Sequence, residues 1–212
     1  MTKLKSAQTS PLERYKKSIE IIEARRLFIL LTGESVEQVL GALGELKERG
    51  HGLVCVDYRI PGIIARMKSI KRKGEMCPGV FSASTAKDVR RAINAGAQYI
   101  FSTHADKGVT KKCRHEKIFL AAGALTPKEV YEANELGADA VSIYPCSAMG
   151  GVNWLIRLIE MFPGIKLIPT DVMTPEEAGD YLKAGAYAVA PILDTRNTEE
   201  ARALFQDFID SN

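Results

Sequence analysis

The chain has 212 residues, 46% of them hydrophobic, and a nearly balanced net charge of +3. This composition excludes a disordered or collagen-like chain, and the charge balance does not indicate a nucleic-acid partner. No apolar run reaches the roughly 18 residues that a membrane-spanning helix needs, and residues 1–17 lack the apolar core of a secretory signal. We therefore expect a cytoplasmic protein with no membrane partner, whose four cysteines are free thiols.

The predicted elements begin with an amphipathic helix over Leu12 to Arg26, within an N-terminal extension that spans residues 1–27. Eight short apolar runs follow and are interpreted as buried strands: Phe28 to Leu31, Leu53 to Val56, Val80 to Phe81, Tyr99 to Ser102, Phe119 to Ala122, Ala140 to Tyr144, Leu167 to Pro169 and Ala188 to Leu193. Helices are predicted between several of them, at Val36 to Arg49, Ile60 to Arg72 and Trp154 to Phe162.

A repeated helix signal recurs three times at one spacing. Thr85, Thr126 and Thr174 each have an acidic residue three positions later and a Gly-Ala pair beginning eleven positions later. Each unit is typical of a helix with a capping box at its start and a glycine at its end. Strand–helix alternation repeated eight times predicts one (β/α)8 TIM barrel over residues 28–212. An open, doubly wound sheet is the alternative fold.

Catalytic groups of such barrels lie at the carboxyl ends of the strands. Polar residues predicted at these ends include Thr32, Asp57, Arg59, Ser82, His104, Ser142, Thr170 and Asp171. We expect Arg59 and Asp57 to share the inner face with Cys55, because residues two apart on a strand point to the same side.

Four stretches of the chain resemble the 2-keto-3-deoxy-6-phosphogluconate / 2-keto-4-hydroxyglutarate aldolase family. They are residues 95–102, residues 122–127, Tyr144-Pro145 with Gly150-Gly-Val152, and Phe162-Pro163 leading to Ile168-Pro-Thr170. The resemblance implies a (β/α)8 barrel, a homotrimer, and cleavage of 2-oxo-4-hydroxy acids through a lysine Schiff base. It implies no cofactor, and we expect no bound metal.

The chain departs from the family at its catalytic positions. The resemblance places the Schiff-base lysine at Ser142 and the acid/base glutamate at Cys55. A hydroxyl cannot form an iminium, and a buried thiol is expected to stay neutral. The family's phosphate-binding glycine turns are replaced by Asp171-Val172 and Pro191-Ile192, which predicts a lost phosphate site.

Other positions keep binding potential. The resemblance places Arg59 and Ser82 at the site for the keto-acid carboxylate and Thr170 at its strand 7 end, while Gly150 and Gly151 offer backbone amides to an anion. Three hypotheses follow. The first is an aldolase-family protein without lysine-dependent activity that binds a small 2-oxo acid or another anion. The second is an enzyme of altered chemistry that uses Asp57, His104 and Asp171 as acid/base groups or metal ligands. The third is a weak aldolase with a relocated lysine, for which Lys107 and Lys111 are the nearest candidates.

Overall fold

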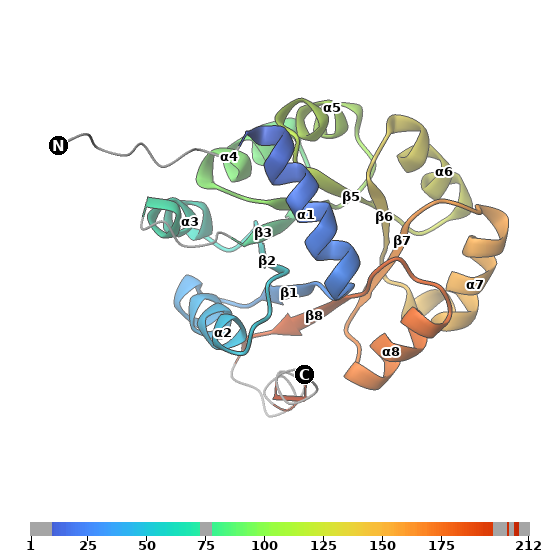
Figure 1. Ribbon diagram of the computed structural model, residues 1–212. Coiled ribbons are helices and arrows are strands. Elements are labelled where there is room, and N and C mark those ends of the chain that lie inside the picture. The colour runs from blue at the N-terminus through green and yellow to red at the C-terminus, as the bar shows by residue number, and fades with distance from the viewer. Residues whose placement is uncertain (1–9, 73–77, 197–202, 204–205, 208–212) are drawn as a thin grey trace.

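The protein forms a closed barrel of eight parallel strands in sequential order, β1 to β8, surrounded by helices (Figure 1). The computed structural model describes residues 10–72, 78–196, 203 and 206–207. The strands are β1 Ile29–Thr32, β2 Val54–Asp57, β3 Gly79–Ala83, β4 Tyr99–Ser102, β5 Phe119–Ala124, β6 Ala140–Ile143, β7 Leu167–Asp171 and β8 Ala190–Asp194. The helices are α1 Pro11–Arg25, α2 Val36–Glu48, α3 Ile63–Arg72, α4 Ala86–Ala95, α5 Lys107–Glu116, α6 Pro127–Leu136, α7 Val152–Met161 and α8 Pro175–Lys183, and a short 3-10 helix, η1, covers Ser147–Met149.

The ring closes because β1 pairs with both of its neighbours. Leu30 lies opposite Cys55 of β2 and opposite Ile192 of β8. The (β/α)8 prediction is therefore confirmed, and the alternative of an open sheet is wrong.

Both faces of the strands are buried, as their continuous apolar runs predict. One hydrophobic cluster fills the barrel interior and includes Leu30, Cys55, Phe101 and Ile168. A second cluster lies between the strands and the surrounding helices and includes their sequence neighbours, such as Leu31 and Val56. This alternation fixes which residues near the strand ends face the barrel axis.

The three repeated units form α4, α6 and α8, each with a complete capping box at its threonine. Gly96 and Gly137 end their helices in the left-handed conformation, with φ values of 106° and 86°. The third unit differs by one residue, since Ala184 caps α8 and the left-handed Gly185 follows it. A threonine cap satisfies a helix amide that no backbone carbonyl can reach. Because each helix follows a strand, all three capped helix starts lie at the same end of the barrel as the carboxyl ends of the strands.

Two helix starts differ from the predictions. α3 begins at Ile63 instead of Ile60, because Pro61 and the left-handed Gly62 form a turn ahead of it. α7 begins at Val152, two residues before Trp154, directly after the glycine pair. No range was predicted for α5, although its N-cap Asp106, which accepts a hydrogen bond from the Val109 amide, is an ordinary start signal.

Helix α1 lies across one end of the barrel, where Figure 1 shows it crossing in front of the strands. Its Ile22 side chain is fully buried and belongs to the interior cluster, beside Phe28. The Phe28 ring meets the ring of Phe101 edge-on with 4.9 Å between centroids. The extra N-terminal helix is therefore confirmed, one residue earlier than predicted. The division of the chain at residues 27 and 28 stays a prediction.

Cys55, Cys113 and Cys146 are buried free thiols, as predicted, and Cys77 lies outside the described residues. Within the described part of the chain, no helix combines the length and the apolar character needed to cross a membrane.

Candidate functional site

A cavity of about 370 Å³ opens at the carboxyl ends of the strands, and we call it the mouth. Most of its walls are apolar or carry hydroxyl groups, and its one charged lining residue among those described is Arg59. The lining residues are Leu30, Thr32, Arg59, Phe81, Ser82, Phe101, Ser102, Thr103, Gly123, Ala124, Ser142, Tyr144, Thr170 and Ile192. The mouth is thus built from residues of every strand or of the turn that follows it.

Arg59 extends from the turn after β2 and is held by the carboxylate of Asp57. Its Nε donates to Oδ1 at 3.0 Å and its Nη2 donates to Oδ2 at 2.6 Å. The Arg59 backbone amide also donates to Oδ1, and the Thr32 hydroxyl donates to Oδ2. The Asp57 side chain is 2% exposed and that of Arg59 is 71% exposed. A buried carboxylate therefore fixes one edge of a guanidinium group that reaches solvent.

This pairing raises the pKa of Arg59 above its ordinary value, because the hydrogen bonds from its side chain to Asp57 stabilise the charged form. Among the described residues, the Nη1 group has no acceptor, so the outer edge of the guanidinium group remains available. Arg59 lines the mouth, whereas Asp57 is not among the lining residues and holds Arg59 as its buried partner.

Ser142 lies near the end of β6 and is buried, with its Oγ 2.7 Å from the Oγ1 of Thr170. The Thr170 hydroxyl also donates to the carbonyl of Ile168 at 3.2 Å. Either hydroxyl can donate in the contact between the two side chains. Among the residues that the structure describes, no histidine or carboxylate is hydrogen-bonded to Ser142, so nothing in this contact activates its hydroxyl as a nucleophile.

Cys55 lies deeper in the barrel, on the same face of β2 as Asp57, as expected. Its side chain is fully buried in the interior cluster. A Cβ added at Gly79 would lie 2.6 Å from its Sγ, so the thiol fills the space beside that glycine. Burial raises the pKa of the Cys55 thiol far above neutrality, which keeps it protonated.

Two backbone features on β3 and β5 shape the wall of the mouth. Ser82 adopts a left-handed conformation, with φ of 63°, at a bulge where the pairing of β3 with β4 shifts between Phe81 and Ala83. A Cβ at Gly123 would lie 2.4 Å from the Thr103 carbonyl oxygen. Only glycine allows β5 to approach the chain after β4 this closely.

His104 and Asp171 lie outside the mouth lining. The exposed His104 ring has its Nδ1 2.9 Å from the Thr103 Oγ1. Asp171 turns toward the loop after β6, where its Oδ2 accepts from the amide and the hydroxyl of Ser147. The described residues contain no group of three or more His, Cys, Asp or Glu side chains able to hold a metal ion. The idea that Asp57, His104 and Asp171 act together as metal ligands is therefore wrong.

The glycine pair before α7 does not present its amides to a ligand. The Gly150 amide donates to the Ser147 carbonyl at 3.0 Å, and the Gly151 amide donates to the Cys146 carbonyl at 3.1 Å. Both bonds belong to the turn that closes η1 onto α7. The prediction of an anion site on these two amides is wrong because the turn already uses them.

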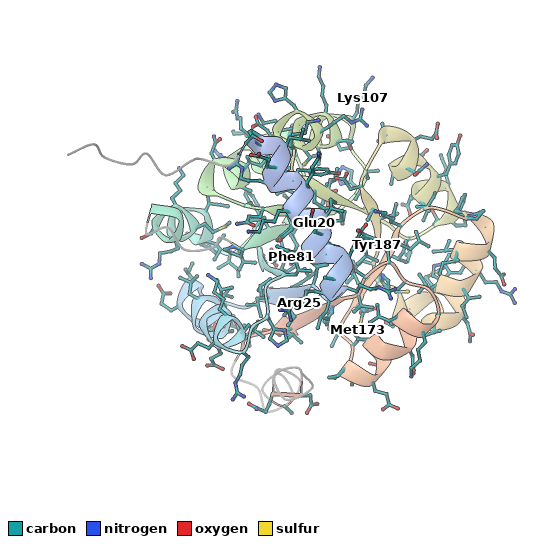
Figure 2. All side chains as sticks on the ribbon, in the orientation of Figure 1. Glu20, Arg25, Phe81, Lys107, Met173 and Tyr187 are labelled. Atoms are coloured by element: carbon teal, nitrogen blue, oxygen red, sulfur yellow. The ribbon has the colours of Figure 1, made fainter. Side chains whose placement is uncertain are left out.

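No described lysine lines the mouth. Lys107 begins α5, and Figure 2 shows its side chain at the periphery of the molecule, whereas Phe81 lies within the barrel. Lys111 is exposed on the same helix.

Three further residues, Phe101, Thr103 and Tyr144, line the mouth and were not predicted from the sequence. Thr103 and Tyr144 each lie two residues beyond an inward-facing residue, Phe101 and Ser142 respectively. Continuing the strand alternation past the last apolar residue would have found them.

Comparison with known proteins places this geometry in one family. The KDPG and KHG aldolase family model matches residues 19–193. A 2-dehydro-3-deoxy-phosphogluconate aldolase of Haemophilus influenzae is 19% identical over 201 residues, which cover 91% of this chain and 95% of the relative.

Solved structures agree on the fold. A 4-hydroxy-2-oxoglutarate / 2-dehydro-3-deoxyphosphogluconate aldolase has a TM-score of 0.72 at 24% identity, covering 95% of this chain and 98% of its own. The KDPG aldolase from Legionella pneumophila, solved with pyruvate captured as a covalent carbinolamine, has the same TM-score at 19% identity and covers 95% of both chains. The family model covers most of the barrel, and this chain therefore belongs to the KDPG and KHG aldolase family.

Proposed function

We propose that this family member does not perform lysine-dependent aldol cleavage and binds a small 2-oxo acid in the mouth. The observation that carries the proposal is the composition of the mouth, whose described lining residues include no lysine. An iminium forms only on an amine, and the serine at the position that resembles the family's lysine provides a hydroxyl.

The chain also lacks an acid/base group at the position that resembles the family's catalytic glutamate. Cys55 stands at the position that resembles the family's glutamate, and burial raises its thiol pKa far above neutrality. A general acid or base works best with a pKa near the working pH, so this thiol is a poor replacement. The loss of both groups supports binding without the standard chemistry.

We expect the 2-oxo acid to bind to the Nη1 side of the Arg59 guanidinium group, which faces away from Asp57. Asp57 occupies Nε and Nη2, which leaves Nη1 to donate to a ligand carboxylate. The hydroxyls of Ser82, Ser142 and Thr170 lie around the same cavity and can donate to a 2-oxo group or to a hydroxyl. The Legionella relative's capture of pyruvate is consistent with this ligand class.

Asp57 limits how strongly an anion binds, because its negative charge offsets that of Arg59. We therefore expect millimolar affinity for pyruvate, and weaker binding in the mouth for phosphorylated 2-oxo acids. The phosphate turns of the family are replaced by Asp171 and Pro191. The homotrimer implied by the resemblance is part of this proposal, and light scattering coupled to size-exclusion chromatography measures it.

Borohydride trapping tests the loss of Schiff-base chemistry. The protein is incubated with pyruvate and sodium borohydride, and its intact mass is measured, with the Legionella aldolase as the positive control. We expect an unchanged mass for this chain and an adduct for the control. A pyruvyl adduct on any lysine of this chain refutes the proposal in favour of a relocated catalytic lysine.

Calorimetric titration with pyruvate tests the binding. We expect the wild-type chain to bind and an Arg59→Gln variant to lose at least most of that affinity. If the wild-type chain shows no binding, or if Arg59→Gln binds equally well, the assignment of the mouth to 2-oxo acids is wrong.

A further inference from the structure

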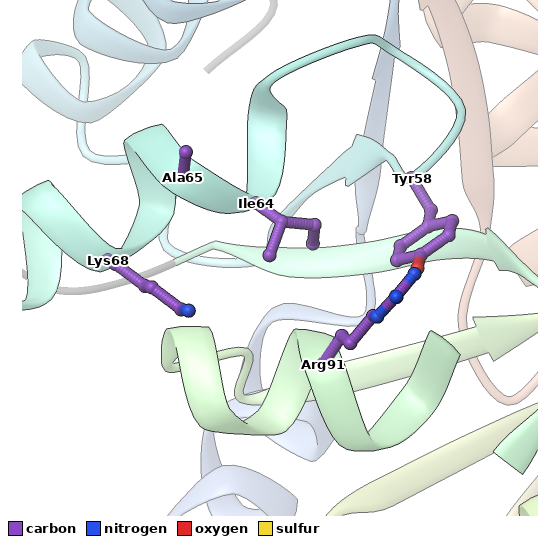
Figure 3. A pocket seen from close by; sticks show the side chains of 5 residues that line it. All are labelled: Tyr58, Ile64, Ala65, Lys68 and Arg91. Carbon is purple, nitrogen blue, oxygen red and sulfur yellow. The ribbon is translucent and has the colours of Figure 1, made fainter. Parts of the chain in front are cut away.

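A second cavity of about 510 Å³ lies on the outside of the barrel between α3 and α4, and we call it the groove. Its lining residues are Tyr58, Ile64, Ala65, Lys68 and Arg91 (Figure 3). Figure 3 shows Lys68 reaching from α3 and Arg91 from α4 toward the space between the two helices, with Tyr58 at one end and Ile64 between them. The groove thus combines two cations with an aromatic ring and an aliphatic floor.

The two helices that form the groove are strongly basic. Their sequences contain seven lysines and arginines and a single acidic residue, an excess of six positive charges in a chain whose net charge is only +3. The cations are Arg66, Lys68, Lys71, Arg72, Lys87, Arg90 and Arg91. The rest of the chain therefore carries a net negative charge, and the two helices that border the groove carry the excess of positive charge in their sequences.

The single carboxylate of these two helices, Asp88, is engaged in the cap of α4. It caps α4 by accepting from the amide and the hydroxyl of Thr85. Burial opposes its ionisation, but hydrogen bonds from Thr85 and from the Tyr58 hydroxyl lower the pKa of Asp88. Within the described part of the chain, neither Lys68 nor Arg91 forms an ion pair.

We propose that the groove binds an organic phosphate ester that carries an aromatic or apolar group. Arg91 holds the phosphate, because an arginine fork matches phosphate oxygens, and Lys68 adds a second positive charge on the other side of Ile64. Tyr58 and Ile64 contact the body of the ligand. Inorganic phosphate would use only the two cations, so the apolar half of the lining favours an ester over the free ion.

The groove is separate from the mouth, since none of the described residues lines both cavities. The proposal therefore survives a failure of the 2-oxo acid proposal. The Lys68 and Arg91 side chains are exposed to solvent, so we expect the affinity of the groove for a phosphate ester to fall as ionic strength rises.

Phenyl phosphate is the probe that tests this site, and it is titrated calorimetrically at low ionic strength. Inorganic phosphate and phenol are titrated as the two halves of the probe. We expect phenyl phosphate to bind more tightly than either half. Equal affinity for phenyl phosphate and inorganic phosphate would refute the role of Tyr58 and Ile64.

Matched variants locate the site. Arg91→Gln removes a lining cation, whereas Arg90→Gln removes the neighbouring exposed cation of α4 that does not line the groove. Loss of a charge-assisted hydrogen bond weakens binding about tenfold or more, so we expect that effect from Arg91→Gln and a change of less than about twofold from Arg90→Gln. Thermal unfolding of both variants checks that they remain folded.

Two outcomes overturn the proposal. Equal loss in both variants would mean that the face attracts anions without a defined site. A single-stranded oligonucleotide that binds far more tightly than phenyl phosphate, with the same loss in both variants, would mean that the basic face serves a polyanion.

Discussion

Replacing Arg59 by alanine tests the clamp that sets the charge of the mouth. The change removes the Nε and Nη2 donors from the Asp57 carboxylate and leaves it with the backbone amide of residue 59 and the Thr32 hydroxyl. A buried negative charge then loses two of its four donor groups.

The size of the effect follows from the unequal exposure of the two partners. Breaking a fully buried ion pair costs about 3–5 kcal/mol, and an exposed pair contributes about 0.2–1 kcal/mol. The Asp57 side chain is 2% exposed, but water reaches the site that the 71% exposed Arg59 side chain vacates. We therefore expect Arg59→Ala to lower the free energy of unfolding by about 2 kcal/mol, between these limits.

The chain offers a matched control at the end of β8. Asp194 holds Arg196 through the same two-residue spacing, with the Arg196 backbone amide and Nε donating at 2.9 and 2.6 Å. The Asp194 side chain is 27% exposed, so water replaces the lost donors there, and Arg196→Ala is expected to cost less than about 1 kcal/mol.

Urea unfolding followed by circular dichroism measures both variants, and Asp57→Asn with the double variant Asp57→Asn/Arg59→Ala completes a cycle for the pair. Equal losses for Arg59→Ala and Arg196→Ala would refute the argument that carboxylate burial decides the cost. A coupling energy near zero would refute the clamp itself.

Two further predictions concern the core and the close approach of the strands. Burial raises the pKa of the Cys146 thiol to about 11, so the unfolded chain releases this proton before the folded chain does, and stability is lost as pH rises from about 8.5 toward 11. The urea midpoint should fall less between pH 8 and pH 10 in Cys146→Ala than in the wild type, and an identical fall would contradict this account. Gly123→Ala should cost more than about 2 kcal/mol, because its Cβ would lie 2.4 Å from a carbonyl oxygen, while Gly44→Ala in α2 meets nothing within 4 Å and should stabilise the protein by about 0.5–1 kcal/mol. Thermal unfolding compares the two, and similar melting shifts would show that the backbone around Gly123 yields easily.

The barrel was predictable because its signals are local and repeated. Threonine caps at residues 85, 126 and 174 with glycines eleven residues later mark helices, and the apolar runs between them mark strands buried on both faces. The start of α3 was missed by three residues because Ile60 continues the apolar periodicity, while Pro61 and Gly62 turn the chain before the helix begins.

The site was only partly predictable, because the sequence does not show which hydrogen-bonding groups a neighbour already uses. Gly150 and Gly151 offer amides as residue types, yet the turn after η1 occupies both. Asp171 directly follows the inward-facing Thr170, so its side chain points away from the barrel axis and accepts a hydrogen bond from Ser147. Arg59 lines the mouth, but the buried carboxylate that holds it became visible only in three dimensions.

The position of α1 determines how a ligand exchanges with the barrel. With Ile22 and Phe28 packed into the interior from one end, the mouth at the other end is the route of entry, and by microscopic reversibility it is also the route of exit. A bulkier side chain that narrows the rim without touching the bound ligand would then slow association and dissociation by the same factor. Such a change would lengthen the residence time of a bound molecule and leave its equilibrium affinity unaltered.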